Sequence, residues 1–144
     1  MPGPEDSLAE AWHGNDTTWR MVMDLNQIVI YGKNDGQLAD QPQRTFYSLC
    51  DGIVGGQGDG PLKPDPLALG VVSFTNDSAW NDICMSHLMG LDIKKIPLLG
   101  AARKFSPFTE TVIRYNGEPI EPSSLKAFAC AAIPPPGWVT YMKV

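Results

Sequence analysis

Residues 45–75, TFYSLCDGIVGGQGDGPLKPDPLALGVVSFT, are the stretch from which the fold can be predicted. Its two ends, Thr45–Val54 and Leu67–Thr75, are apolar and rich in aromatic and β-branched residues, a composition typical of β-strands. The second of them is almost uninterrupted apolar sequence, as expected of a strand that is covered on both faces. Between the two strands the chain carries few side chains, and we expect a loop over Gly55–Pro61.

Glycine loses more backbone freedom on folding than any other residue, so a run of glycines indicates that the backbone itself has a role. Two interpretations of that role are open. In the functional interpretation the backbone N–H groups converge on an anion or a cofactor, since no side chains intervene. In the structural interpretation the glycines adopt positive φ in a tight loop beneath a neighbouring helix. The segment fails the G-x-G-x-x-G pattern at Pro61 and lacks a Walker lysine. The candidate cofactor-binding glycines are Gly52, Gly55, Gly56, Gly58 and Gly60.

Three aspartates could add carboxylates to this loop. Asp51 and Asp59 flank the glycines and would repel a bare phosphate, so we expect any anion there to arrive with a divalent cation, which prefers carboxylate oxygens. Asp82 falls near the first turns of a predicted helix, where it could project toward the end of the preceding strand or simply stabilise the helix N-terminus. The hypothesis therefore takes Asp51 and Asp82 as catalytic residues and all three aspartates as metal ligands.

Other elements follow from periodicity and capping residues. The sequence predicts a helix over 17–31, a helix from about residue 77 to Gly90, a short helix over 96–104 and strands at 111–115 and 138–142. This order predicts an α/β or α+β fold in which helices flank one mixed β-sheet. We expect residues 1–11 to be a flexible lead-in and residues 12–144 to form a single domain. The candidate caps are Asn15, Asp16 or Thr17 for the first helix and Asn76, Asp77 or Ser78 for the second, and Asn116-Gly117 is a hairpin-type turn.

Composition excludes several classes of function. Acidic residues outnumber basic ones 16 to 11, for a net charge of −5, which argues against binding a nucleic-acid backbone. No window is apolar enough to span a membrane, and no signal peptide is evident, so we expect a cytoplasmic protein. The three cysteines, Cys50, Cys84 and Cys130, show no C-x-x-C spacing, which favours free thiols in a reducing compartment. No Ser/His/Asp arrangement can be placed, which disfavours nucleophilic hydrolysis.

Several motifs in combination resemble the core of a bacterial and archaeal family called domain of unknown function 362. They are Asp51–Gly56, Leu69–Val72, Asn76 with Asp82, Leu88–Gly90 and Lys95–Pro97, and the likeness runs from about Trp12 to Val139. The resemblance implies a ligand contact for Asn15, Thr17 and Arg20, of which the arginine could clamp a carboxylate or phosphate. Without the resemblance, capping explains the first two and an exposed helix position explains Arg20.

The resemblance also bears on partners. Some family members carry ferredoxin-type cysteine clusters, which implies redox work, but this chain lacks such a cluster and is not expected to bind iron–sulfur itself. The family's domain usually extends further on the N-terminal side, so we expect this chain to be a C-terminal portion that pairs with itself or with a partner chain. Two functions stay open: a metal-assisted or redox-associated enzyme, or a non-catalytic module that docks a small anion or a redox partner protein.

Overall fold

The computed structural model describes residues 17–60, 62–104, 106 and 111–135. The chain divides between Arg44 and Thr45 into two compact units. The sequence pattern indicates no boundary at this position. The predicted lead-in at 1–11 and the predicted strand at 138–142 lie outside the described residues. No helix among the residues described is both long and apolar enough to cross a membrane.

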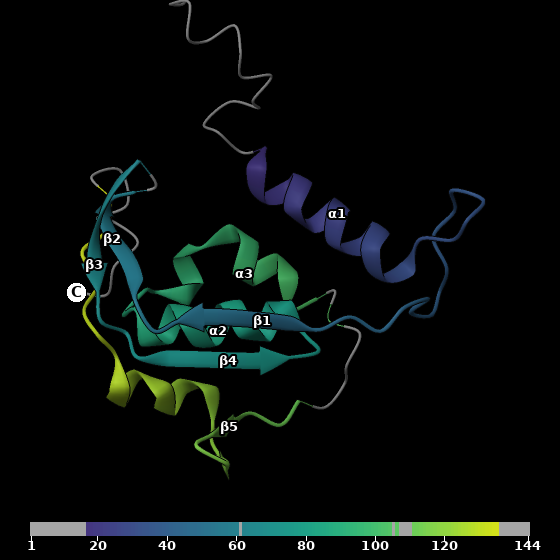
Figure 1. Cartoon of the computed structure of the whole chain (residues 1–144). Helices are drawn as coiled ribbons and strands as arrows, with labels where there is room; N and C mark the ends of the chain where they lie inside the picture. The colour runs from purple at the N-terminus through teal and green to yellow at the C-terminus, as the bar shows by residue number, and fades with distance from the viewer. Residues whose placement is uncertain (1–16, 61, 105, 107–110, 136–144) are drawn as a thin grey trace, which may run out of the picture. The chain divides into compact units, whose positions relative to one another are not determined.

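The first unit is built on α1 (Thr18–Tyr31), which confirms the helix predicted over 17–31 (Figure 1). Met23 and Ile30 are its buried side chains, and because they lie seven residues apart they share one face. Thr17 occupies the N-cap position, but its side chain makes no cap hydrogen bond, so capping by this hydroxyl was a wrong prediction. After the helix the chain folds back, and the Arg44 guanidinium donates to the carbonyl oxygen of Val29 at 2.7 Å.

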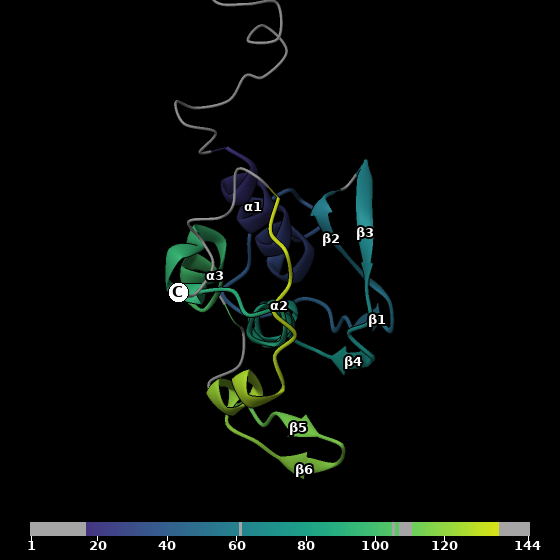
Figure 2. The same ribbon diagram turned by 90° about the vertical axis from the view of Figure 1, so that its left-hand side faces the viewer.

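The second unit contains three two-stranded sheets and confirms the α+β class (Figures 1 and 2). The single mixed sheet that the sequence predicted is not formed by the described residues, because all three pairings are antiparallel. Neighbouring strands joined by short turns pair as hairpins, whereas parallel pairing needs a long crossover. The sheets pair β1 (Ser48–Gly52) with β4 (Val71–Thr75), β2 (Gly55–Asp59) with β3 (Lys63–Leu67), and β5 (Arg114–Tyr115) with β6 (Glu118–Pro119).

The glycine-rich segment is a strand, and the prediction of a loop there was wrong. It forms β2 because β3 follows within a few residues and pairs with it, although β3 contains Pro64 and Pro66 and prolines argue against a strand. These prolines lie opposite Gly58 and Gly56, at alternate positions of the ladder. Alternate positions of an antiparallel strand do not bond to the partner, so the missing N–H groups cost the hairpin no hydrogen bonds.

Helix α2 (Ser78–Leu88) is the centre of the second unit and confirms the second predicted helix. The carboxylate of Asp77 caps it by accepting from the N–H groups of Ala79 at 3.0 Å and Trp80 at 3.3 Å. Gly90 follows the helix with φ of +77°, the left-handed conformation predicted for its C-terminal end. The remaining helices are η1 (Ile93–Lys95), α3 (Pro97–Ala102), which confirms the predicted short helix, and η2 (Pro122–Phe128), which the sequence did not predict.

The core of this unit lies around α2, which packs against β4, α3, η1 and η2. Both views of the ribbon show α2 beside the β1–β4 pair (Figures 1 and 2). Packing of α2 against several elements buries small and aliphatic side chains on more than one side of it. The buried apolar residues are Ala79, Ile83, Leu88, Leu99, Ala102, Leu125 and Ala132.

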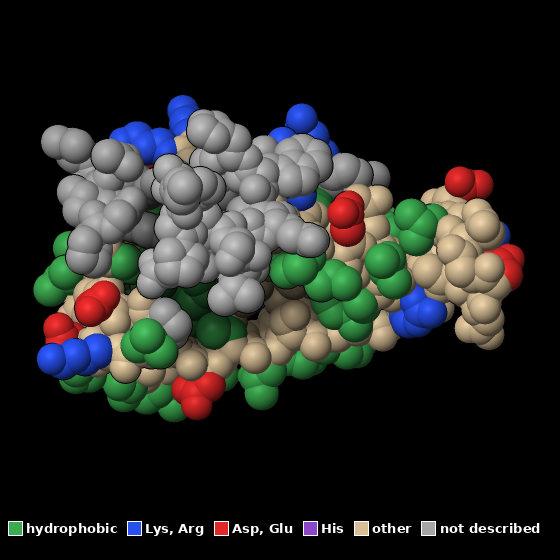
Figure 3. Space-filling model, turned by 90° about the horizontal axis from the view of Figure 1, so that it is seen from above, with side chains coloured by type: hydrophobic (Ala, Val, Ile, Leu, Met, Phe, Trp, Pro, Cys, Tyr) green, Lys and Arg blue, Asp and Glu red, His purple; other side chains and the backbone are tan. Residues whose placement is uncertain are grey.

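Strand β4 is covered on one face, so the prediction that it is covered on both was wrong. Val71, Ser73 and Thr75 are half-buried on the face toward α2, whereas Val72 and Phe74 are 59% and 69% exposed on the other. Tyr47 stacks on Phe74 with ring centroids 5.3 Å apart, which extends this apolar face. Figure 3 shows hydrophobic side chains at several places on the visible surface, between charged ones.

Candidate functional site

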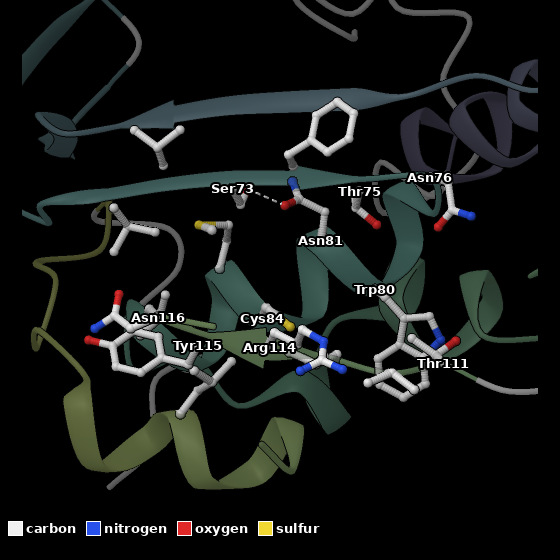
Figure 4. Close-up of a pocket in the computed structure, with 18 of the residues that line it drawn as sticks. Ser73, Thr75, Asn76, Trp80, Asn81, Cys84, Thr111, Arg114, Tyr115 and Asn116 are labelled. Atoms are coloured by element: carbon white, nitrogen blue, oxygen red, sulfur yellow. Dashed lines mark hydrogen bonds between the residues drawn. The ribbon is translucent and has the colours of Figure 1, made fainter. Parts of the chain in front are cut away.

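A cavity of the second unit, here called the β4–α2 pocket, has a volume of about 580 Å³. One wall is the run Gly70–Asn76, which includes all of β4, and the opposite wall is the run Thr111–Asn116, which includes β5. Helix α2 contributes Trp80, Asn81, Cys84, Met85 and Leu88. Figure 4 shows the side chains of Trp80, Asn81 and Cys84 between the two walls. The pocket is thus a slot bordered by two extended segments that lie more than thirty residues apart in the sequence.

Arg114 is the one charged residue among the described residues that line the β4–α2 pocket. Its guanidinium donates to the carbonyl oxygen of Gly117 at 3.0 Å, and this bond holds the cation near the β5–β6 turn. Planar guanidinium groups recognise carboxylates and phosphates by paired, charge-assisted hydrogen bonds. The pocket therefore offers a site for an anionic group.

A hydrogen bond between two elements sets the polarity of the pocket floor. The Ser73 hydroxyl on β4 lies 2.5 Å from the side-chain oxygen of Asn81 on α2, as the dashed line in Figure 4 marks. Because the hydroxyl occupies the amide oxygen, the NH₂ group of Asn81 is left to donate to a ligand. The floor thus adds a neutral donor to the cation at Arg114.

Cys84 lines the same pocket but lacks the character of a reactive thiol. Burial raises the pKa of the Cys84 thiol to about 11, because the thiolate would lose its hydration. The thiol is therefore protonated at neutral pH, whereas nucleophilic and metal-binding cysteines are thiolates. Cys84 contributes a small apolar surface to the pocket.

The predicted cofactor-binding glycines lie elsewhere in the unit, on β2, in its turn and at the end of β1. The N–H of Gly58 donates to the carbonyl oxygen of Ile133 at 2.7 Å, and the N–H of Ile133 donates to the Gln57 side chain at 3.0 Å. One amide that was predicted to hold a guest is thus bonded to the protein's own backbone. A small, mainly apolar cavity of about 200 Å³ is lined by Gly56, Gly58 and Gly60 together with residues 132–135.

The structure does not gather the three predicted metal-binding aspartates into one site. Asp51 is exposed on β1 and accepts from the N–H of Ile53 at 3.2 Å, and Asp59 is exposed at the end of β2. Partial desolvation raises the pKa of Asp82, although this side chain keeps enough exposure for water to screen its charge. Within the described part of the chain, no group of three or more His, Cys, Asp and Glu side chains could hold a metal ion. None of these aspartates lines the β4–α2 pocket.

The remaining predicted site residues belong to the first unit. Asn15 lies outside the described residues, and Thr17 precedes α1. Arg20 is exposed on α1, and its guanidinium lies over the ring of Trp19, 4.5 Å from the centroid. A ligand contact for these residues stays a prediction.

Sequence reasoning missed the residues that make the β4–α2 pocket polar. Ser73 is the one hydroxyl within the apolar run Leu69–Phe74, and Arg114 is the one charge within the alternating run Thr111–Tyr115. Both signals are visible in the sequence, but nothing in the chain order indicates that the two runs face each other. Comparison with family models, with curated proteins and with solved structures found no match to this chain.

Replacing Gly58 by alanine is expected to lower the free energy of unfolding by about 1–2 kcal/mol. Gly58 has a φ of +75°, where a side chain is strained, and a Cβ atom there would lie 3.4 Å from a carboxylate oxygen of Asp65. The matched control is Gly60→Ala, whose Cβ would make an ordinary contact of 3.8 Å with Pro64, and we expect a change within about 0.5 kcal/mol. Urea denaturation measures both, and equal losses would contradict the backbone argument.

Proposed function

We propose that this chain is a non-catalytic binding module that docks a ligand or partner segment carrying an anionic group in the β4–α2 pocket. The observation that carries the proposal is the lining of that pocket, in which Arg114 is the one charged side chain from the part of the chain that the structure describes. A single cation on an otherwise neutral wall favours a ligand of opposite charge and would repel a cationic one. The NH₂ group of Asn81, whose side-chain oxygen accepts from Ser73, adds a second donor for the same ligand.

The arrangement of acidic groups supports binding over metal-assisted catalysis. Catalysis as the sequence predicted it would use Asp51 and Asp82 together in one cleft, beside the glycine amides. Neither aspartate lines the β4–α2 pocket, and the Cys84 thiol in that pocket is protonated at neutral pH. The groups that the pocket does contain, the Arg114 guanidinium and the Asn81 NH₂, can hold and orient a ligand.

The proposal also includes the cellular compartment of the protein and the family that its sequence motifs resemble. All three cysteines, Cys50, Cys84 and Cys130, are free, which favours a reducing compartment such as the cytoplasm. The sequence motifs that resemble domain of unknown function 362 favour a place beside redox proteins, with this chain as the accessory partner. Under this proposal, the chain supplies the docking site and the partner supplies the redox centre.

The test compares benzoate with its neutral isostere benzamide, each titrated into the full chain and followed by NMR chemical shifts. Benzoate is expected to bind about tenfold more tightly, a difference of about 1.4 kcal/mol, because only its carboxylate can pair with Arg114. Arg114→Gln should remove the difference between the two probes. Lys104→Gln, at an exposed cation outside the pocket lining, should preserve it. Equal binding of the two probes, or no binding of either, would overturn the proposed function.

A further inference from the structure

The edge of β4 that faces away from β1 has no strand beside it among the described residues. The carbonyl oxygen of Val71 points toward β1, because a Cβ atom on Gly52, its partner in the ladder, would lie 3.0 Å from that oxygen. Because antiparallel ladders alternate, Val71, Ser73 and Thr75 direct their backbone groups toward β1. Val72 and Phe74 therefore direct their N–H and C=O groups to the opposite edge.

Those edge groups border the β4–α2 pocket. The backbone groups of Val72 and Phe74 on that side form no hydrogen bond with another described residue. Consecutive residues of β4 line the pocket, which is what a cavity running along a strand edge requires. The edge thus presents a row of donors and acceptors to the cavity, and such a row is a template for another strand.

The size of the cavity fits a short strand. A strand residue spans about 3.4 Å along the chain, about 4.8 Å between strands and about 10 Å between layers, or on the order of 160 Å³. The pocket volume of about 580 Å³ corresponds to three or four such residues. The opposite wall, Thr111–Asn116, is itself extended at β5 and would border the far side of the added strand.

We propose that the β4–α2 pocket binds an extended peptide segment of another protein, which adds as a strand to the free edge of β4. This inference rests on the proposed function and names the class of ligand. Side chains on one side of the peptide would face Cys84, Met85 and Leu88 on α2, and small apolar residues fit that surface. Side chains on the other side would lie on the solvent face, where Arg114 is exposed and favours an acidic residue.

A second copy of this chain is the competing occupant, and charge argues against it. Edge-to-edge pairing of two copies would place β4 beside β4, and Val71–Thr75 contains no acidic residue. Such pairing would therefore leave Arg114 without an anionic partner from the added strand. A segment of another protein that alternates apolar and acidic residues can form backbone hydrogen bonds with the edge of β4. Its acidic side chains can also pair with Arg114.

The first measurement is amide hydrogen exchange, read by NMR on the full chain alone and with the blocked peptide acetyl-Val-Glu-Val-Glu-Val-amide. In the free chain the amides of Val72 and Phe74 should exchange faster than those of Val71, Ser73 and Thr75, which bond to β1. Saturating peptide should slow the first set at least tenfold and leave the second set unchanged. Protection of the first set in the free, dilute chain would mean that the edge is already filled, and would overturn the proposal.

Two control peptides test separately how backbone hydrogen bonds and side-chain charge contribute to binding. The same peptide N-methylated at its glutamate amides, which lie opposite Val72 and Phe74, keeps every side chain but cannot donate to the edge. We expect it to bind at least tenfold more weakly. Acetyl-Val-Lys-Val-Lys-Val-amide keeps the backbone and reverses the charge near Arg114, and should also bind at least tenfold more weakly. Equal binding of the N-methylated peptide would overturn strand addition.

The outcomes also separate this inference from the proposed function. If benzoate binds through Arg114 while the valine–glutamate peptide does not bind, the pocket is a small-anion site and strand addition is wrong. If neither probe binds, the proposed function fails as well. If protection of Val72 and Phe74 grows with protein concentration together with the molecular mass in solution, the occupant is a second copy and the inference is overturned.

Discussion

Replacing Ile83 by alanine should lower the free energy of unfolding of the second unit by about 2–5 kcal/mol. Ile83 is 1% exposed and lies on α2, the helix against which β4, α3 and η2 pack. The substitution removes the favourable transfer free energy of the lost methyl and methylene groups. It also leaves a cavity, because the surrounding side chains belong to several elements and cannot all move in to fill it. Urea denaturation followed by tryptophan fluorescence, to which Trp80 on the same helix contributes, measures the change.

The matched control for Ile83 is an apolar side chain that nothing covers. Leu62 is 97% exposed, so Leu62→Ala removes a side chain of the same size without opening a cavity. We expect its effect to stay within about 0.5 kcal/mol. Similar losses for the two variants would show that the packing around α2 does not stabilise the second unit.

Replacing Asp77 by alanine should cost about 2–3 kcal/mol. The Asp77 carboxylate is 4% exposed and accepts hydrogen bonds from the N–H groups of Ala79 and Trp80 and from the Ser106 hydroxyl. Alanine would remove the helix cap and leave these donors facing a site without an acceptor. Denaturant midpoints, together with the helix signal in circular dichroism, measure the loss.

Asp77→Asn is the matched control for this cap. Asparagine keeps one side-chain oxygen that can accept from the first-turn N–H groups, and it is as good an N-cap as aspartate. We therefore expect less than half of the loss seen with alanine. An asparagine variant as unstable as the alanine variant would show that the charge of Asp77, and not the hydrogen bonds at the helix N-terminus, stabilises α2.

Features of the fold that depend on neighbouring residues were predictable. The two longer helices, α1 and α2, follow from apolar periodicity. The residue types limited the cap of α2 to Asn76, Asp77 or Ser78, and the structure has Asp77 in that place. Asn116-Gly117 was predicted as a turn, and both residues have positive φ, 51° and 89°. Each of these features depends on contacts that span a few residues, so the chain carries the necessary information locally.

The glycine-rich segment shows where local reasoning fails. Glycines and prolines disfavour strands, so residues 55–67 indicated a loop. The structure pairs them as β2 and β3, with Pro64 and Pro66 placed where no ladder bond is needed and Gly58 bonded to Ile133. This outcome depends on register and on a segment about seventy-five residues away, neither of which a local pattern encodes.

Residue composition and local spacing were thus sufficient for the helices, the α2 cap, the hairpin turn and the α+β class of this chain. The exposed face of β4 and the meeting of Ser73, Asn81 and Arg114 at one pocket were not accessible in this way. Both depend on which surfaces α2 covers and on how close two distant extended segments come. Burial and long-range packing decide such distances, and they arise from the whole folded unit and not from any window of the chain.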